Sequence, residues 1–457
     1  MAKKKTQFVL AGLAAALTYG MAATPAIAGQ RSFTPSYESA PTPIKPHDPT
    51  DTDASWLNEP GVNETARKYL NKLLQPDGMQ VEALLLEATN VELRFRNTRY
   101  SVTPQALGRA ARAMANIMPA SVSQFVLTPI VAGLPVSSVT FQRADLENYE
   151  NHPNGTELSF ANAEISDPIT MPEGLQYDAS LYPKFTWSLG PDIEFSHDEL
   201  TSSNQYSVRL RASARWNISP GLFINGSLTK ELFGNISTTV PSTSPLQHVR
   251  SDRGLYLDQG DPAVETLKAD YLFKATPAVY GRISAGYLER MFGGISGELL
   301  WKPAAQNWGL GAEVNHVKQR DFSSAFGFQD YDVTTGFVSA YYEFKGGLST
   351  QLDVGRYLAG DNGATLSLNK RFTNGWAVGV FYTKTNADVA ENTKTGFRVT
   401  IPLNWIIKSP SRESYGVAFG SSGADAGSRL RADNRLYDLV REYHGPELED
   451  SWARFWR

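Results

Sequence analysis

The chain of 457 residues carries 43 lysine and arginine residues against 47 aspartate and glutamate residues, and it contains no cysteine. The nearly balanced charge argues against a dedicated nucleic-acid-binding protein, and the lack of cysteine excludes disulfides and thiolate metal sites. Beyond the N-terminal region no apolar run approaches the roughly 20 residues that a membrane-spanning helix needs. A transmembrane β-barrel stays compatible with this composition, because its strands hide half of their residues from lipid.

The N-terminus has the three parts of a secretory signal peptide. Lysines occupy positions 3–5, an apolar stretch covers residues 8–23, and the small residues Ala26 and Ala28 follow. We therefore predict a signal peptide over residues 1–28 and export to the outer membrane of a Gram-negative bacterium. A membrane-anchoring helix is the less favoured alternative, because the apolar stretch is short and Pro25 interrupts its end.

A proline-rich linker is predicted over residues 29–61, followed by a small periplasmic α/β domain over residues 62–150. Thr103-Pro104 is typical of a helix start, since proline is well tolerated in the first turn. Strand-like segments precede and follow that helix, so the order β-α-β-β indicates a sheet with one covering helix. The segment lacks histidine, a glycine-rich phosphate loop and clustered carboxylates, which favours a scaffold over a catalytic domain.

Residues 180–457 alternate between apolar and polar positions over segments of roughly ten residues. Val208 and Leu210, for example, oppose Arg209 and Arg211. A soluble sandwich or an outer-membrane barrel could produce this pattern. Aromatic residues near strand ends, charges at mid-strand and the signal peptide favour the barrel. The predicted fold class is mainly β: a transmembrane antiparallel outer-membrane β-barrel of about 12–16 strands, preceded by the small α/β domain.

Charged residues on the polar face are the candidate functional residues. Such a lining could guide an anionic polysaccharide or set pore selectivity, or its charges could pair with each other and plug the interior. Histidines at 197, 248 and 316 show no spacing typical of a catalytic triad, so we predict no enzyme activity and no catalytic, cofactor-binding or metal-binding residues. The predicted lumen-lining residues are Arg209, Arg211, Arg215, Arg282, Glu298, Glu313, Asp353, Arg356 and Arg398.

Several motifs together resemble the YjbH/GfcD-like family of exopolysaccharide outer-membrane proteins. The resemblance covers the small domain and the barrel region, and its motifs are specific as a set. They are ATPAVYGRISAGYLE at 275–289, FGGISGELLWKP at 292–303, DVGRYLAGD at 353–361, NGWAVG at 374–379 and WARFW at 452–456.

The resemblance implies a non-enzymatic role in the export or assembly of an exopolysaccharide or capsule. The barrel would then lie in outer-membrane lipid, and the α/β domain would dock periplasmic export proteins. Phe455 and Trp456 are the candidates for the aromatic signal that barrels of this class carry at their end. A general porin-like channel is the main alternative, and a hydrolase at the barrel rim is a less favoured one.

Overall fold

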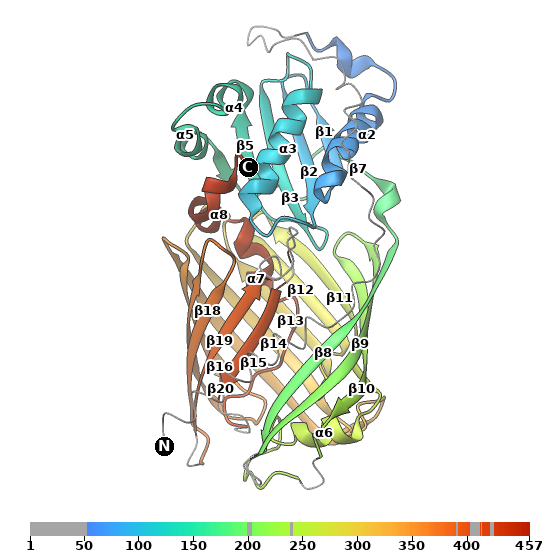
Figure 1. Ribbon diagram of the computed structural model, residues 1–457, viewed down its shortest axis with the longest axis vertical. Coiled ribbons are helices and arrows are strands. Elements are labelled where there is room, and N and C mark those ends of the chain that lie inside the picture. The colour runs from blue at the N-terminus through green and yellow to red at the C-terminus, as the bar shows by residue number, and fades with distance from the viewer. Residues whose placement is uncertain are drawn as a thin grey trace. The chain divides into compact units, whose positions relative to one another are not determined.

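The computed structural model describes residues 53–198, 203–237, 241–389, 392–402, 412, 414–420 and 425–457. Two sheets and several short helices make up this part of the chain (Figure 1). The predicted signal peptide and most of the predicted linker lie outside the described residues. The described end of that linker contains a short 3-10 turn, Ser55–Asn58, whose Trp56 packs against the core of the smaller sheet.

The smaller sheet belongs to the predicted α/β domain, and its strands lie in the order β6-β5-β3-β2-β1-β7. Strands β2 and β3 pair in parallel, and helix α3 connects them, beginning at Thr103 as predicted. The chain continues past the predicted boundary at residue 150 with α5, β6 and β7 before it leaves the domain. The elements are α2 (Val62–Leu74), β1 (Met79–Leu86), β2 (Asn90–Asn97), α3 (Thr103–Ile117), β3 (Gln124–Val131), β4 (Leu134–Pro135), β5 (Ser138–Gln142), α4 (Arg143–Tyr149), α5 (Gly155–Ala161), β6 (Glu164–Ser166) and β7 (Gln176–Tyr177).

The core of the α/β domain lies between its sheet and the helices α2 and α3. Leu70 and Leu74 of α2 and Leu107 and Met114 of α3 are fully or almost fully buried there. These residues recur at helical spacing, so one face of each helix is apolar and turns toward the sheet. Burial of that face supplies most of the stability of both helices, because isolated helices of this length are marginal in water.

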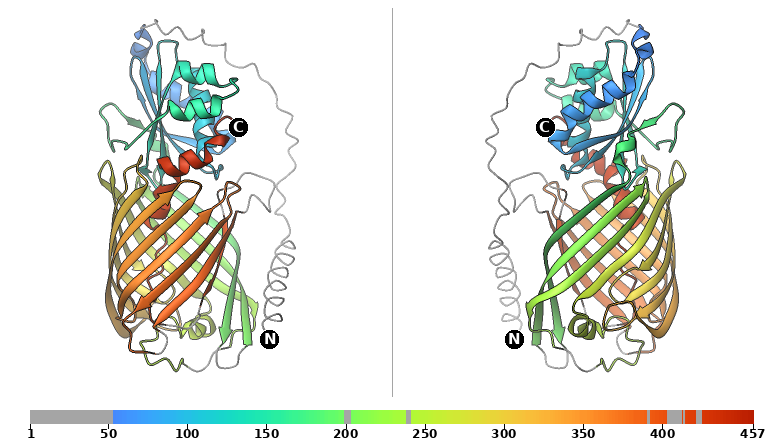
Figure 2. Two further views of the ribbon diagram at one scale, coloured as in Figure 1. Left: turned by 90° about the vertical axis from the view of Figure 1, so that its left-hand side faces the viewer. Right: turned by 90° about the vertical axis from the view of Figure 1, so that its right-hand side faces the viewer.

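In the part of the chain that the structure describes, the larger sheet has thirteen antiparallel strands that follow one another in chain order. Figures 1 and 2 show this sheet curled around an interior, with β8 and β20 as its edge strands. The strand number lies within the predicted range, and among the described residues each edge strand pairs with one neighbour. The strands are β8 (Lys184–Asp198), β9 (Ser203–Ser219), β10 (Leu222–Gly234), β11 (Ala263–Thr276), β12 (Val279–Tyr287), β13 (Phe292–Trp301), β14 (Trp308–Arg320), β15 (Phe328–Phe344), β16 (Leu348–Arg356), β17 (Asn362–Arg371), β18 (Ala377–Thr385), β19 (Thr393–Pro402) and β20 (Ser414–Gly420).

The two faces of the curled sheet have opposite character, as the period-two pattern predicts. In β15 the side chains of Thr335, Ser339 and Glu343 are buried on the inner face, whereas Val338 is 64% exposed on the outer face. Two residues per repeat send neighbouring side chains to opposite sides of a strand. The outer face is therefore apolar, whereas the inner face encloses polar and charged side chains together with apolar ones such as Phe337 and Tyr341, and an exposed apolar outer face is the reverse of a soluble sandwich.

The prediction that the large β-structure extends to residue 457 needs a correction. The last strand ends at Gly420, and the described chain beyond it forms α7 (Leu436–Val440), α8 (Gly445–Ser451) and two 3-10 turns. Phe455 is buried in the core of the α/β domain, so it does not close a strand. Apolar residues such as Leu436 and Val440 are spaced four apart here, which suits a helical turn rather than a strand. Among the described residues, no helix is both long and apolar enough to cross a membrane.

Candidate functional site

The interior of the curled sheet is the candidate functional site, because it encloses most of the buried charge of the chain. Arg282 of β12 is almost fully buried and donates from Nε to Glu298 Oε2 of β13 at 3.0 Å. Asp353 of β16 accepts from the hydroxyl of Ser339. Buried charges persist in folded proteins only when they are paired or hydrogen-bonded, and these groups meet that condition.

Part of this interior is filled by residues 425–440, which we call the inner segment. Arg429 of this segment lies 2.9 Å from Glu313 and 2.9 Å from Asp353, and Arg435 lies 2.6 Å from the same Glu313. The backbone N–H of Leu436 donates to Glu298 at 3.1 Å. The inner segment therefore binds the carboxylates of three neighbouring or nearby strands with its arginines and its backbone.

Aromatic packing adds to these charged contacts around α7. The ring of Tyr437 stacks on Tyr341 of β15, with 3.9 Å between centroids, and its hydroxyl donates to Glu343 at 2.9 Å. Leu436 and Val440 join an apolar cluster with inward-facing residues of the large sheet and with Val136 from the α/β domain. The interior thus contains a small apolar core at the end that faces the α/β domain.

The opposite end of the interior is covered by the connection between β10 and β11, which contains α6 (Arg253–Gln259). Arg209 is fully buried there and donates to the backbone carbonyls of Leu257 and Gly260. The carboxylate of Asp425 accepts from the hydroxyl of Ser251 at 2.8 Å, which ties the start of the inner segment to this connection. Segments of the chain therefore cover both ends of the interior.

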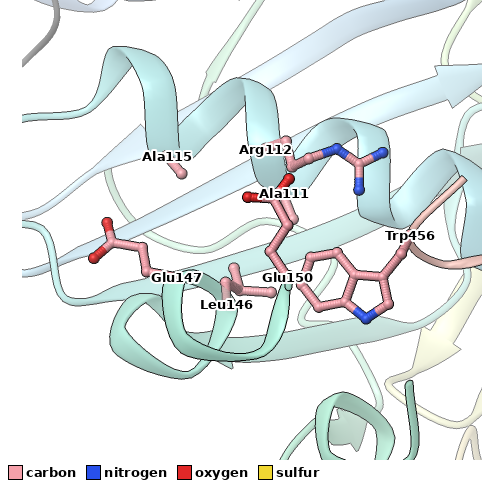
Figure 3. A pocket seen from close by; sticks show the side chains of 7 residues that line it. All are labelled: Ala111, Arg112, Ala115, Leu146, Glu147, Glu150 and Trp456. Atoms are coloured by element: carbon pink, nitrogen blue, oxygen red, sulfur yellow. The ribbon is translucent and has the colours of Figure 1, made fainter. Parts of the chain in front are cut away.

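Residues 445–457, which we call the C-terminal anchor, continue from the inner segment into the α/β domain. Trp452 and Phe455 are buried in that domain's core and stack on each other with centroids 4.8 Å apart. Trp456 lines a hollow of about 30 Å³ beside Arg112 of α3 (Figure 3). That volume suits a water molecule or the tip of a side chain, so we do not assign it as a site for a sugar.

His444 marks the joint between the inner segment and the C-terminal anchor. The side chain is fully buried, and its Nε2 lies 3.0 Å from the carbonyl oxygen of Val136 and 3.3 Å from the hydroxyl of Tyr280. Burial lowers the pKa of His444 well below its ordinary value, and the ammonium of Lys302 lowers it further. The imidazole is therefore neutral, and it connects the α/β domain, the large sheet and the C-terminal chain.

The predicted lumen-lining residues fall into three groups in the structure. Five of them form buried or partly buried networks of the inner face, as described above: Arg209, Arg282, Glu298, Glu313 and Asp353. Arg211 pairs with Asp192 at 2.8 Å, and the guanidinium of Arg215 lies over the ring of Phe223, both on the inner face. Arg398 lies opposite Gly379 on the inner side of β19 and is exposed.

Arg356 is the exception, and its prediction as a lumen-lining residue is wrong. It is the last residue of β16 and shares its parity with Leu352 and Val354, whose side chains are exposed on the outer face. Its Nε donates to the carbonyl of Gly360 in the following turn at 3.3 Å. At a strand end the side chain can fold back onto a turn, so a charge there says little about the interior.

Sequence reasoning missed the inner segment altogether. The usable signal was the loss of period-two alternation after residue 420, together with arginines at 429, 431, 435 and 441. Those arginines complement the predicted row of inward carboxylates, but no local pattern places the two sets together. Only the three-dimensional structure shows that the inner segment lies against the inner face of the sheet.

The histidines do not form a catalytic group in the described residues. His316 is exposed on the outer face, where its Nδ1 lies 3.0 Å from the hydroxyl of Thr334. His248 pairs with Asp252 at 2.9 Å within the connection that covers the interior. The side chain of His197 lies outside what the structure describes. In the described ranges no group of three or more histidine, aspartate and glutamate residues could hold a metal ion.

Comparison with known proteins identifies a family model and a relative that match this chain. A family model described as "Exopolysaccharide biosynthesis protein YbjH" matches residues 12–442, a range that includes both sheets and the inner segment. A protein of Escherichia coli strain K12 named "Uncharacterized lipoprotein YjbH" is 29% identical over 425 residues, covering 89% of this chain. The chain spans 59% of the length of that relative.

Solved structures with some similarity include two outer-membrane proteins. OmpF of Salmonella typhi, in complex with daunomycin, is 10% identical with a TM-score of 0.29, covering 58% of this chain and 94% of that one. OmpT of Vibrio cholerae is 9% identical with a TM-score of 0.25, covering 55% of this chain and 92% of that one.

Proposed function

The chain belongs to the YjbH family of exopolysaccharide biosynthesis proteins, and from this premise we propose that it exports or assembles an exopolysaccharide at the outer membrane. In this proposal the larger sheet is a transmembrane β-barrel, and the chain reaches the outer membrane by its N-terminal signal peptide. The protein acts without catalysing a reaction. The α/β domain lies in the periplasm and docks export proteins there.

The observation that carries the proposal is the contrast between the two faces of the larger sheet. Trp187, Val314 and Val338 are each more than 60% exposed on the outer face, at 73%, 61% and 64%. Water-soluble proteins rarely present apolar area continuously around a whole sheet, whereas a bilayer covers such a surface at no cost. Aromatic residues at strand ends, such as the paired Trp308 and Tyr342, suit a membrane interface.

Membrane insertion also requires that β8 and β20 meet. Hydrocarbon offers no hydrogen-bond partners, and each unsatisfied backbone group costs several kcal/mol there. With thirteen strands in antiparallel order, the first and the last run in the same direction. We therefore propose that the barrel closes by parallel pairing of these two edge strands.

The polar groups of the inner face support the proposal that the substrate is a hydrated polymer. Its side chains are serines, threonines, carboxylates and guanidinium groups, which can bind sugar hydroxyls, carboxylates and water. An anionic polysaccharide would meet Arg211, Arg215 and Arg398. These three predicted lumen-lining residues lie on the inner face and are partly or fully exposed there.

Gene deletion tests the role, and the purified protein tests the membrane assignment. Deletion in a polymer-producing strain should lower the surface polymer, and a plasmid copy should restore it. Unchanged polymer after deletion would reject the function. The purified protein should require detergent and should migrate differently in gels before and after boiling, as folded barrels do.

A general porin-like channel is the second candidate, because its inner face would also be polar. The inner segment and the β10–β11 connection weigh against it, since both occupy the path that small solutes would take. Planar bilayers separate the two candidates. Large, steady conductance with free passage of unrelated solutes would favour the porin-like channel over the proposed function.

A further inference from the structure

We propose that the inner segment is a movable plug, which leaves the inner face when polymer passes and returns to it afterwards. This inference rests on the proposed function, because it assigns a regulation to the same interior. It follows from the ion pairs that join the inner segment to the sheet and from the apolar burial of the C-terminal anchor in the α/β domain.

The contacts between the inner segment and the sheet combine ion pairs with apolar packing around α7. Arg429 and Arg435 bind Glu313, and their side chains stay 18% and 19% exposed. Water and the charged groups of a passing polymer can therefore reach these guanidinium groups, although salt screens such partly buried pairs less than exposed ones. The inner segment can therefore exchange its partners without disturbing the backbone pairing of the sheet.

The C-terminal anchor is held in a different way. Leu448, Trp452 and Phe455 are buried in the apolar core of the α/β domain, and Nε1 of Trp452 donates to the hydroxyl of Ser159 at 3.0 Å. Neither salt nor a polar polymer competes with apolar burial. When the inner segment leaves the sheet, the α/β domain therefore keeps hold of its far end, and Trp456 stays beside α3 (Figure 3).

The joint between the two parts lies where the α/β domain meets the larger sheet. Nε2 of His444 contacts the carbonyl of Val136, and the N–H of Gly445 donates to the carbonyl of Ala304 at 2.7 Å. A displacement of the α/β domain relative to the sheet would pull directly on α7. Movement of the α/β domain therefore displaces the inner segment, and docking of an export protein on this domain would cause that movement.

Release of the plug uncovers a row of carboxylates on adjacent strands. Glu298, Glu313 and Asp353 lie on β13, β14 and β16, and Glu343 lies on β15 between them. Arg429, Arg435 and Tyr437 satisfy three of these groups in the closed state. The uncovered row repels an anionic polymer and attracts the arginines again, so the interior closes once the polymer has left.

Reversible cross-linking in the cysteine-free chain tests this plug. Tyr341→Cys combined with Tyr437→Cys places one thiol on β15 and one on α7, where the two rings now stack. The periplasm is oxidising, and where a direct disulfide does not form, a short bis-methanethiosulfonate bridges the pair by forming one disulfide with each thiol and releasing methanesulfinate, a bridge that reductant cleaves. Val338→Cys with Val354→Cys is the matched control, because these residues pair in register on the outer face of β15 and β16.

The assay measures the amount of surface polymer. It uses a strain in which deletion of the gene abolishes this polymer and the variants are supplied on a plasmid. Bridging the Tyr341/Tyr437 pair should lower the polymer at least tenfold, reductant should restore it, and the control pair should export normally. Normal export with the bridge intact would overturn the plug and leave the proposed function standing. Unchanged polymer in the deletion mutant would reject both.

A charge variant gives a second test that needs no cross-link. Arg429→Gln combined with Arg435→Gln weakens the plug and leaves the C-terminal anchor unchanged. In planar bilayers the purified variant should open at least tenfold more often than the natural protein at the same salt concentration. Equal opening frequencies would overturn the plug.

Discussion

Phe455→Ala should strongly destabilise the α/β domain without affecting the larger sheet, although residue 455 follows the larger sheet in the sequence. The side chain is fully buried, 5.3 Å from the ring of Phe141 and 4.8 Å from that of Trp452. Replacing a buried phenylalanine with alanine typically costs about 3–5 kcal/mol. Small domains have net stabilities of roughly 5–15 kcal/mol, so the loss is a large fraction of the total.

Urea unfolding in detergent measures this effect. For a domain of this size the free energy of unfolding falls by roughly 2 kcal/mol per molar urea, so the midpoint should drop by about 2 M. The change in tryptophan fluorescence follows the α/β domain through Trp56, Trp452 and Trp456, which contact its core, while the tryptophans on the larger sheet give a constant signal as long as that sheet stays folded. Gel migration before and after boiling reports the larger sheet separately and should not change.

Arg454→Ala is the matched control, because this residue belongs to the same turn and is only partly buried. A change within about 0.5 kcal/mol is expected for it. If Phe455→Ala shifts the urea midpoint no more than the control does, the C-terminal anchor is not part of the domain core. The α/β domain would then not hold the end of the inner segment, and the proposed plug would fail as well.

Three further predictions concern the sheet and the joint. Val338→Arg on the outer face should cost about 2–4 kcal/mol and reduce folded protein in membranes, whereas a water-exposed site would tolerate it within about 0.5 kcal/mol. Arg282→Ala should cost about 3–5 kcal/mol in urea or heat, because it leaves Glu298 buried without its partner, and the double variant with Glu298→Ala should recover part of the loss. The lowered pKa of His444 means that stability is complete above its unfolded pKa near 6.5 and falls by up to about 1.4 kcal/mol for each pH unit below it. Protease cleavage of the C-terminal chain should therefore rise between pH 6.5 and 5, and His444→Gln should remove this dependence.

The strands could be predicted because their pattern is local. In β15 every second residue from Val333 to Glu343 is buried and the residues between them are exposed, apart from the partly buried Gly336, and that rhythm is visible in the letters alone. Helix α3 could be predicted for the same reason, since Thr103-Pro104 and the spacing of its apolar residues are contained in one short stretch. The opposite faces of the sheet then follow from geometry, which is why most of the predicted inward charges do lie inside.

The contacts that close the interior could not be predicted, because they join distant parts of the chain. Nothing near Glu313 shows that its partners are Arg429 and Arg435, more than a hundred residues later. Nothing near Gly108 shows that the backbone of Phe455 packs against it. Arg356 was misplaced although its parity with Leu352 and Val354 indicates the outer face, where its side chain binds the carbonyl of Gly360 in the following turn.

The burial of Leu448, Trp452 and Phe455 in the α/β domain has a consequence for biosynthesis. The α/β domain cannot complete its core before residues 448–455 have been synthesised, although its own strands and helices precede the larger sheet in the sequence. The domain and the C-terminal chain therefore reach their folded state together.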